Sequence, residues 1–166
     1  MIAHYILFNL SVYLGWMLYF NLLQRPFFLL YNRRSAPEGV TAADLRSIFT
    51  HAFRTDIVSA SYLSAIPLLA STAQLFIAGE FLREFMTVYI VVISIAMGLI
   101  VVADTLLYKF WEFKLEASVL HFLRSLKGTC ASVSSLYILA VLGLWAVWSA
   151  LSGVWLLAVL KLALHA

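Results

Sequence analysis

Long stretches of apolar residues without a charge dominate this sequence. The longest lies between Lys127 and Lys161. A helix needs about 20 mostly apolar residues to cross the hydrocarbon core of a bilayer, which is about 30 Å thick. The chain is 64% apolar and 11% charged, whereas a soluble domain is about 25% charged. The sequence therefore predicts an all-α fold, a polytopic membrane helix bundle in a single domain.

Four stretches are long enough to cross a membrane, and we expect spans over about 2–31, 57–78, 85–107 and 131–160. The second contains Pro67, which removes a backbone donor and tends to kink a helix. In lipid such a defect is tolerated where neighbours satisfy the freed backbone. The fourth stretch is longer than one perpendicular crossing needs. It forms either one long, tilted helix, which we favour, or a hairpin broken at Ser152–Gly153.

Two segments between these spans are too polar to cross a membrane and have amphipathic helical spacing. In about 42–54, apolar residues recur at i, i+3, i+4, i+7 and i+8, and Thr41 can cap the helix start. In about 115–127, apolar residues again fall on one face, opposed by charged ones. Such helices lie in the plane of the membrane interface. We expect both segments to do so.

Acidic residues at the ends of the spans are candidate contacts. A carboxylate in or near a span is costly and usually faces the bundle interior or a polar cavity. Asp104 is therefore a candidate contact for a lipid headgroup or a partner. Alternatively, it lies just outside the hydrocarbon and pairs with Lys109 or caps backbone groups. Asp56, where the second span starts, is either a headgroup or partner contact or the N-cap of that span.

Arginines after the first span form the other candidate group. Arg25, Arg33 and Arg34 are candidates for binding lipid phosphates, because a guanidinium group presents paired donors that match phosphate. The alternative is the ordinary basic flanking of a membrane span.

The sequence contains no motif for metal binding, nucleophilic catalysis or phosphate binding. The four histidines are scattered and form no HExxH motif, and Cys130 is the only cysteine. Neither a GxSxG nucleophile turn nor a glycine-rich phosphate loop is present. The basic residues form no continuous track along a phosphate backbone, so we expect no nucleic acid partner.

Three stretches carry a resemblance to a known family. They are RPFFLLYN at 25–32, FRTD at 53–56 with Tyr62 and Pro67 beyond it, and DTLLYKFWEFKL at 104–115, which continues through His121-Phe122-Leu123 to Ala131-Ser132-Val133-Ser134. From about Leu22 to Val141, the chain resembles the membrane-embedded N-terminal region of lipoteichoic acid synthase-like phosphoglycerol transferases of the sulfatase superfamily. The similar form is the one common in Bacteroidetes-type bacteria.

The resemblance implies about five transmembrane helices, followed by an extracytoplasmic sulfatase-fold domain with a threonine nucleophile and a divalent metal, usually manganese. No position here matches the family's catalytic or metal residues, so the resemblance implies no catalysis and no cofactor in this chain, from which the catalytic domain is absent. It implies a multi-pass anchor in the bacterial cytoplasmic membrane. Its partners would be membrane lipids, including anionic phospholipid headgroups, and the C-terminal catalytic domain. Asp56, Asp104, Tyr108 and the two interfacial helices would form a membrane-side platform.

Two orientations of the chain in the membrane remain open. Most basic residues lie in the loops after the first and third spans, which the positive-inside rule would place in the cytoplasm. The family arrangement places those loops outside, and we favour it.

The alternative function is a stand-alone helical scaffold or partner-binding protein. A small transporter is less favoured, because only Asp104 approaches a buried charge.

Overall fold

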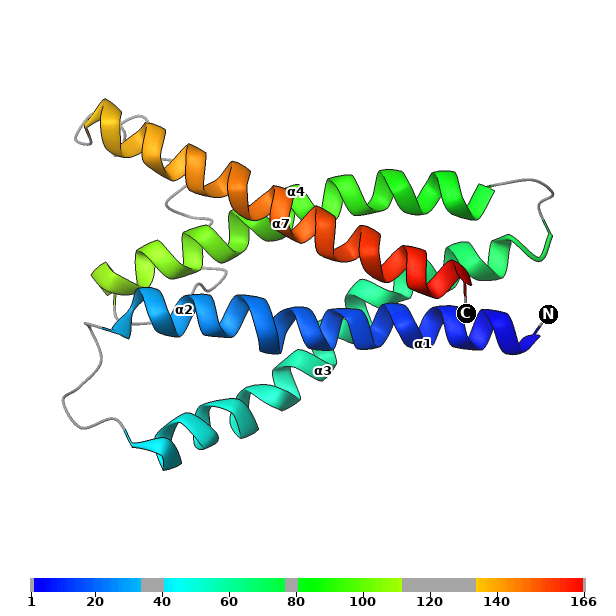
Figure 1. Ribbon diagram of the computed structural model, residues 1–166, viewed down its shortest axis with the longest axis horizontal. Coiled ribbons are helices and arrows are strands. Elements are labelled where there is room, and N and C mark those ends of the chain that lie inside the picture. Colours follow the sequence, from blue (N-terminus) through cyan, green and yellow to red (C-terminus); the bar gives the residue numbers. More distant parts are fainter. Residues whose placement is uncertain (1, 34–40, 77–80, 112–133, 166) are drawn as a thin grey trace.

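The computed structural model describes residues 2–33, 41–76, 81–111 and 134–165, which form four helical rods (Figure 1). The first rod is made of α1 (Ile2–Leu18), the π-helix η1 (Tyr19–Gln24) and α2 (Arg25–Tyr31). The others are α3 (Ala42–Ala73), α4 (Phe81–Trp111) and α7 (Ser135–His165).

Successive rods run in opposite directions, so both ends of the chain lie at one end of the bundle (Figure 1). We call this the terminal end. At the opposite end, the loop end, α2 and α4 finish and α3 and α7 begin. Near the loop end, the first parts of α3 and α7 diverge from the other rods, and most of their side chains are exposed.

Three of the rods are long and apolar enough to cross a membrane: His4–Tyr31, Phe81–Tyr108 and Ser135–Ala163. Their outer surfaces are apolar. On α1, for example, Leu10, Leu14 and Leu18 follow one another at four-residue spacing and are exposed. Apolar faces of this extent are suited to lipid rather than water. The all-α fold is therefore confirmed, and three of the four expected spans correspond to helices that could cross a membrane.

α3 joins two elements that the sequence separates, the interfacial helix at 42–54 and the span beginning at residue 57. The helix begins with a capping box, in which Thr41 Oγ1 accepts from the Asp44 N–H and the Asp44 carboxylate accepts from the Thr41 N–H. The Thr41 N–H and the Thr41 hydroxyl both donate to the carboxylate and hold the pKa of Asp44 below its ordinary value. Between the two parts lies neither glycine nor proline, so the backbone hydrogen bonds continue although the polarity changes.

The structure also bears on the predicted extent of the third and fourth spans. α7 runs unbroken through Ser152–Gly153, which is the single-helix alternative. α4 extends beyond the predicted 85–107 at both ends. The second predicted interfacial helix, 115–127, lies outside the described residues.

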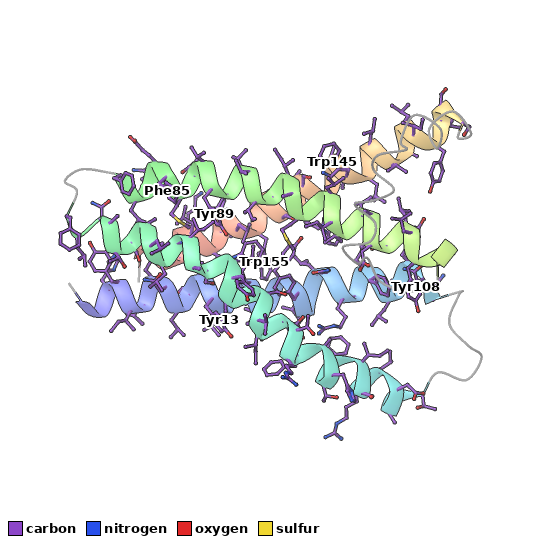
Figure 2. The ribbon with its side chains drawn as sticks, turned by 180° about the vertical axis from the view of Figure 1, so that it is seen from behind. Tyr13, Phe85, Tyr89, Tyr108, Trp145 and Trp155 are labelled. Atoms are coloured by element: carbon purple, nitrogen blue, oxygen red, sulfur yellow. The ribbon has the colours of Figure 1, made fainter. Side chains whose placement is uncertain are left out.

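Pro67 lies buried inside α3 and leaves a backbone acceptor without its usual donor. In an α-helix the N–H of residue 67 would donate to the Leu63 carbonyl, but proline has no N–H. The Tyr89 hydroxyl of α4 donates to the Leu63 oxygen instead, at 2.7 Å (Figure 2). A neighbouring helix thus replaces the missing donor, which is how lipid-embedded helices tolerate proline.

α4 and α7 cross closely because both carry serine and glycine at a four-residue spacing. Gly98 of α4 lies against Ser149 of α7, and Gly153 lies against Ser94. A Cβ atom at Gly98 would be 3.0 Å from the Ser149 backbone nitrogen. Small residues at such crossings let helix backbones approach closely in membranes.

We expect Gly98→Ala to destabilise the bundle by about 1–3 kcal/mol, because the new methyl group meets backbone and the helices must separate. Gly143→Ala is the matched control on α7, since a Cβ there would meet no atom of another described helix within 4 Å. Alanine is the better helix former, so this control is expected to be neutral or stabilising. Thermal unfolding in detergent micelles measures both. Equal effects of the two substitutions would contradict the close crossing.

A second prediction concerns Tyr89. Tyr89→Phe removes the donor to the Leu63 carbonyl and is expected to cost about 1–2 kcal/mol, since a buried acceptor is left unpaired. In a Pro67→Ala background the backbone N–H of residue 67 can serve that carbonyl, and the cost should shrink. A double-mutant cycle on thermal stability measures the coupling. Additive effects would show that Tyr89 does not compensate for the proline.

Candidate functional site

Charged residues mark the two boundaries of an uncharged layer. On α4 no charged residue lies between Glu84 and Asp104, and on the first rod no charged side chain precedes Arg25, which lies 21 residues after the polar His4. At 1.5 Å per residue, each interval is about 30 Å long, the thickness of a hydrocarbon core. Arg25 and Asp104 thus lie at one boundary, at the loop end. The polar residues near this boundary form the candidate site.

Arg25 and Asp56 form an ion pair between the first rod and α3. The Arg25 Nη2 and Asp56 Oδ2 atoms are 2.6 Å apart, and each side chain is only 10% exposed. Asn21 completes the cluster: its Oδ1 accepts from Arg25 Nη1 at 2.7 Å, and its Nδ2 donates to Asp56 Oδ2 at 3.2 Å. The two charges are neutralised and hydrogen-bonded, as burial requires.

The local sequence explains how Arg25 reaches this position. Pro26 cannot donate to the Leu22 carbonyl, and its ring would clash with that carbonyl in a regular α-helix. The wider π turn of η1 precedes it, with the Arg25 N–H donating to the Phe20 oxygen five residues back, so Pro26 lies in the first turn of α2. The Arg25 guanidinium carbon lies 4.9 Å from the centre of the Phe49 ring of α3, a cation–π contact.

A second group of contacts joins α2 to α4 at the same end. Asn32 Nδ2 donates to the Thr105 carbonyl at 3.3 Å. The Phe28 and Tyr108 rings meet edge to face, with their centres 4.9 Å apart (Figure 2). Asp104, next to Thr105, is half-buried. Asn32 is 6% exposed, and its Oδ1 has no hydrogen-bond partner among the described residues.

The structure separates the predicted site residues into three groups. Arg25 and Asp56 bind each other, and Asp56 is not an N-cap because α3 continues through it. Tyr108 packs in the α2–α4 contact beside the half-buried Asp104. Arg33 is exposed, and Arg34 lies outside the described residues.

Sequence reasoning missed Asn21, Asn32 and Phe49. Asn21 precedes Arg25 by four residues, which places the two side chains on one helix face, and this spacing was an available signal. The contacts of Asn32 and Phe49 join residues far apart in the sequence, and nothing in the sequence indicates them.

Deeper in the bundle, a buried polar network links η1 to α7. Trp148 Nε1 donates to the Tyr19 hydroxyl at 3.1 Å, and that hydroxyl lies 2.8 Å from Ser152 Oγ. Ser152 Oγ donates in turn to the Trp148 carbonyl. Because all these groups have partners, the network joins helices and offers no free group to a ligand.

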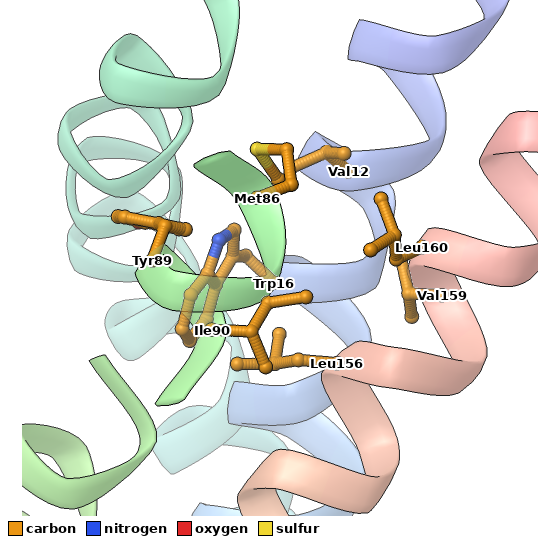
Figure 3. A pocket seen from close by; sticks show the side chains of 8 residues that line it. All are labelled: Val12, Trp16, Met86, Tyr89, Ile90, Leu156, Val159 and Leu160. Carbon is orange, nitrogen blue, oxygen red and sulfur yellow. The ribbon is translucent and has the colours of Figure 1, made fainter. Parts of the chain in front are cut away.

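A small apolar pocket lies between α1, α4 and α7 (Figure 3). It is lined by Val12, Trp16, Met86, Tyr89, Ile90, Leu156, Val159 and Leu160. The Nε1 atom of Trp16 is buried, and within the described part of the chain it has no hydrogen-bond partner. The cavity volume of about 10 Å³ is close to the minimum for one water molecule. The pocket is therefore too small for a substrate.

Among the described residues, no group of three His, Cys, Asp or Glu side chains is placed to hold a metal ion.

The ion pair predicts a specific mutational pattern. Asp56→Asn leaves the buried Arg25 charge without its counter-ion and is expected to destabilise the bundle by about 3 kcal/mol. Arg25→Gln should cost a similar amount, and the double variant less than the sum of the two. Arg54→Gln, two residues from Asp56 but exposed, is the control and should change stability by less than about 0.5 kcal/mol. Additivity in thermal unfolding of the purified chain would contradict the coupling.

Searches of protein family models, curated proteins and solved structures found no match to this chain. The fold supports a coarser conclusion than a family: the three long apolar helices indicate a multi-pass membrane protein.

Proposed function

We propose that this chain is the membrane anchor and membrane-side platform of a lipoteichoic acid synthase-like phosphoglycerol transferase in a bacterial cytoplasmic membrane. The anchor performs no catalysis itself. The catalytic domain, with its threonine nucleophile and divalent metal, would be a separate part of the full-length enzyme.

One observation carries the proposal: RPFFLLYN at 25–32, FRTD at 53–56 and the described part of the third stretch, 104–111, lie together at the loop end. Arg25 of the first stretch pairs with Asp56 of the second. Asn32 of the first donates to the carbonyl of Thr105, which belongs to the third. These stretches lie far apart in the sequence, and their contacts favour one shared role at one end of the bundle.

The contacts favour a positioning role for these residues. Arg25, Asn21 and Asp56 bind one another, and Phe28 and Tyr108 bind each other. They fix α2 between α3 and α4 at the height where the bundle leaves the hydrocarbon. A rigid end of this kind is what a platform under a soluble domain requires.

The first test is the genomic sequence downstream of Ala166. An open reading frame that leads into a further span and a sulfatase-type domain is the expected result. A stop codon there would overturn the proposal and favour the alternative, a stand-alone helical scaffold.

In the full-length enzyme, we expect Asp104→Ala to lower turnover or the yield of folded protein. A platform shifted by about 1 Å can lower turnover as much as 100-fold. Glu84→Ala is the matched control, an exposed carboxylate on the same helix at the terminal end, and should have little effect. A phosphoglycerol transfer assay and the yield of purified protein measure the two outcomes. Wild-type values of both for Asp104→Ala would remove this residue from the platform.

A further inference from the structure

Three arginines at the loop end are exposed: Arg33 at the end of α2, and Arg46 and Arg54 on α3. No acidic side chain within the described part of the chain forms an ion pair with them. The acidic groups of α3 are already engaged, since the Asp44 carboxylate accepts from Thr41 and Asp56 binds Arg25. The loop end thus presents three cations to its surroundings.

We propose that Arg33, Arg46 and Arg54 form a cationic collar that binds the phosphates of anionic phospholipids around the loop end. The inference needs only that the bundle spans a bilayer, and it holds whether or not a catalytic domain follows.

The height of Arg54 matches the headgroup layer, and Arg46 and Arg33 lie far enough out that only their long side chains reach back to it. A bilayer is about 30 Å thick in its core and about 40–45 Å with its headgroups, which leaves about 5–8 Å on each side. Arg54 lies two residues beyond Asp56, about 3 Å along the helix, and Asp56 is level with Arg25 at the hydrocarbon boundary. Arg46 and Arg33 lie farther out. α3 is inclined to the first rod (Figure 1), which reduces the height of Arg46, and long arginine side chains extend toward the interface.

The arrangement along α3 also fits a lipid interface. Arg46, Thr50 and Arg54 follow at four-residue spacing and form one polar stripe. Leu45, Phe49 and Phe53 form an apolar stripe beside it and continue the face that α3 buries deeper in the bundle. Phe53 is 50% exposed directly beside Arg54. A soluble acidic partner would leave this ring in water, whereas the headgroup boundary accommodates both groups.

The test is binding of dioctanoyl phosphatidylglycerol to the detergent-purified chain, with dioctanoyl phosphatidylcholine as the zwitterionic comparison. Native mass spectrometry gives the dissociation constants. We expect tighter binding of phosphatidylglycerol, weakening with added salt. Each arginine removed should weaken it about five-fold, so Arg46→Gln with Arg54→Gln gives up to about thirty-fold.

Two control variants separate charge from other effects. Thr50→Gln places the same new side chain on the same stripe with no change of charge and should bind as wild type does. Arg46→Lys with Arg54→Lys keeps the charge and should retain most of the preference. Equal binding of the two lipids by the wild-type chain would overturn the proposal, and so would wild-type binding by the double glutamine variant. Should the double variant unfold, the two single glutamine variants and the salt series decide.

Discussion

Polar groups inside this bundle depend on the protein itself for partners, because hydrocarbon supplies neither donors nor acceptors. This constraint accounts for the hydrogen bonds that join the helices. Tyr89 serves the carbonyl that Pro67 leaves unpaired. The indole N–H groups of Trp155 and Trp145 donate to the carbonyls of Gly15 and Ile95 on neighbouring helices. Large aromatic side chains therefore fill space and satisfy the backbone at the same time.

The same constraint separates the middle of the bundle from its loop end. In the middle, small residues and neutral hydrogen bonds hold the helices close, as at the α4–α7 crossing. Full charges occur at the boundary, where Arg25 and Asp56 neutralise each other. Beyond it, α3 and α7 diverge and expose more of their side chains. Any function of this chain toward a lipid headgroup or a soluble domain is therefore best sought at the loop end.

The sequence predicts the three long apolar helices well because a bilayer imposes a length and a composition that can be counted. α1, α4 and α7 follow from uncharged stretches alone. The ends of α3 cannot be predicted in this way. The change in polarity near Asp56 resembles a boundary between two helices, although the helix continues through it. The role of Asp56 was equally inaccessible, since its partner Arg25 lies 31 positions earlier. A helix pattern shows which face a residue occupies, but not which helix that face meets.

The ion pair and the exposed arginines together bear on the conflict over orientation. Arg25 is neutralised within the bundle, so it contributes less to the charge bias of its loop than a count of basic residues indicates. A free cation near a span end counts toward the cytoplasmic bias, but anionic headgroups of either leaflet can also bind it. If the exposed arginines bind such headgroups, a basic loop end is compatible with the extracytoplasmic side. The charge distribution and the orientation implied by the family resemblance are then no longer in conflict.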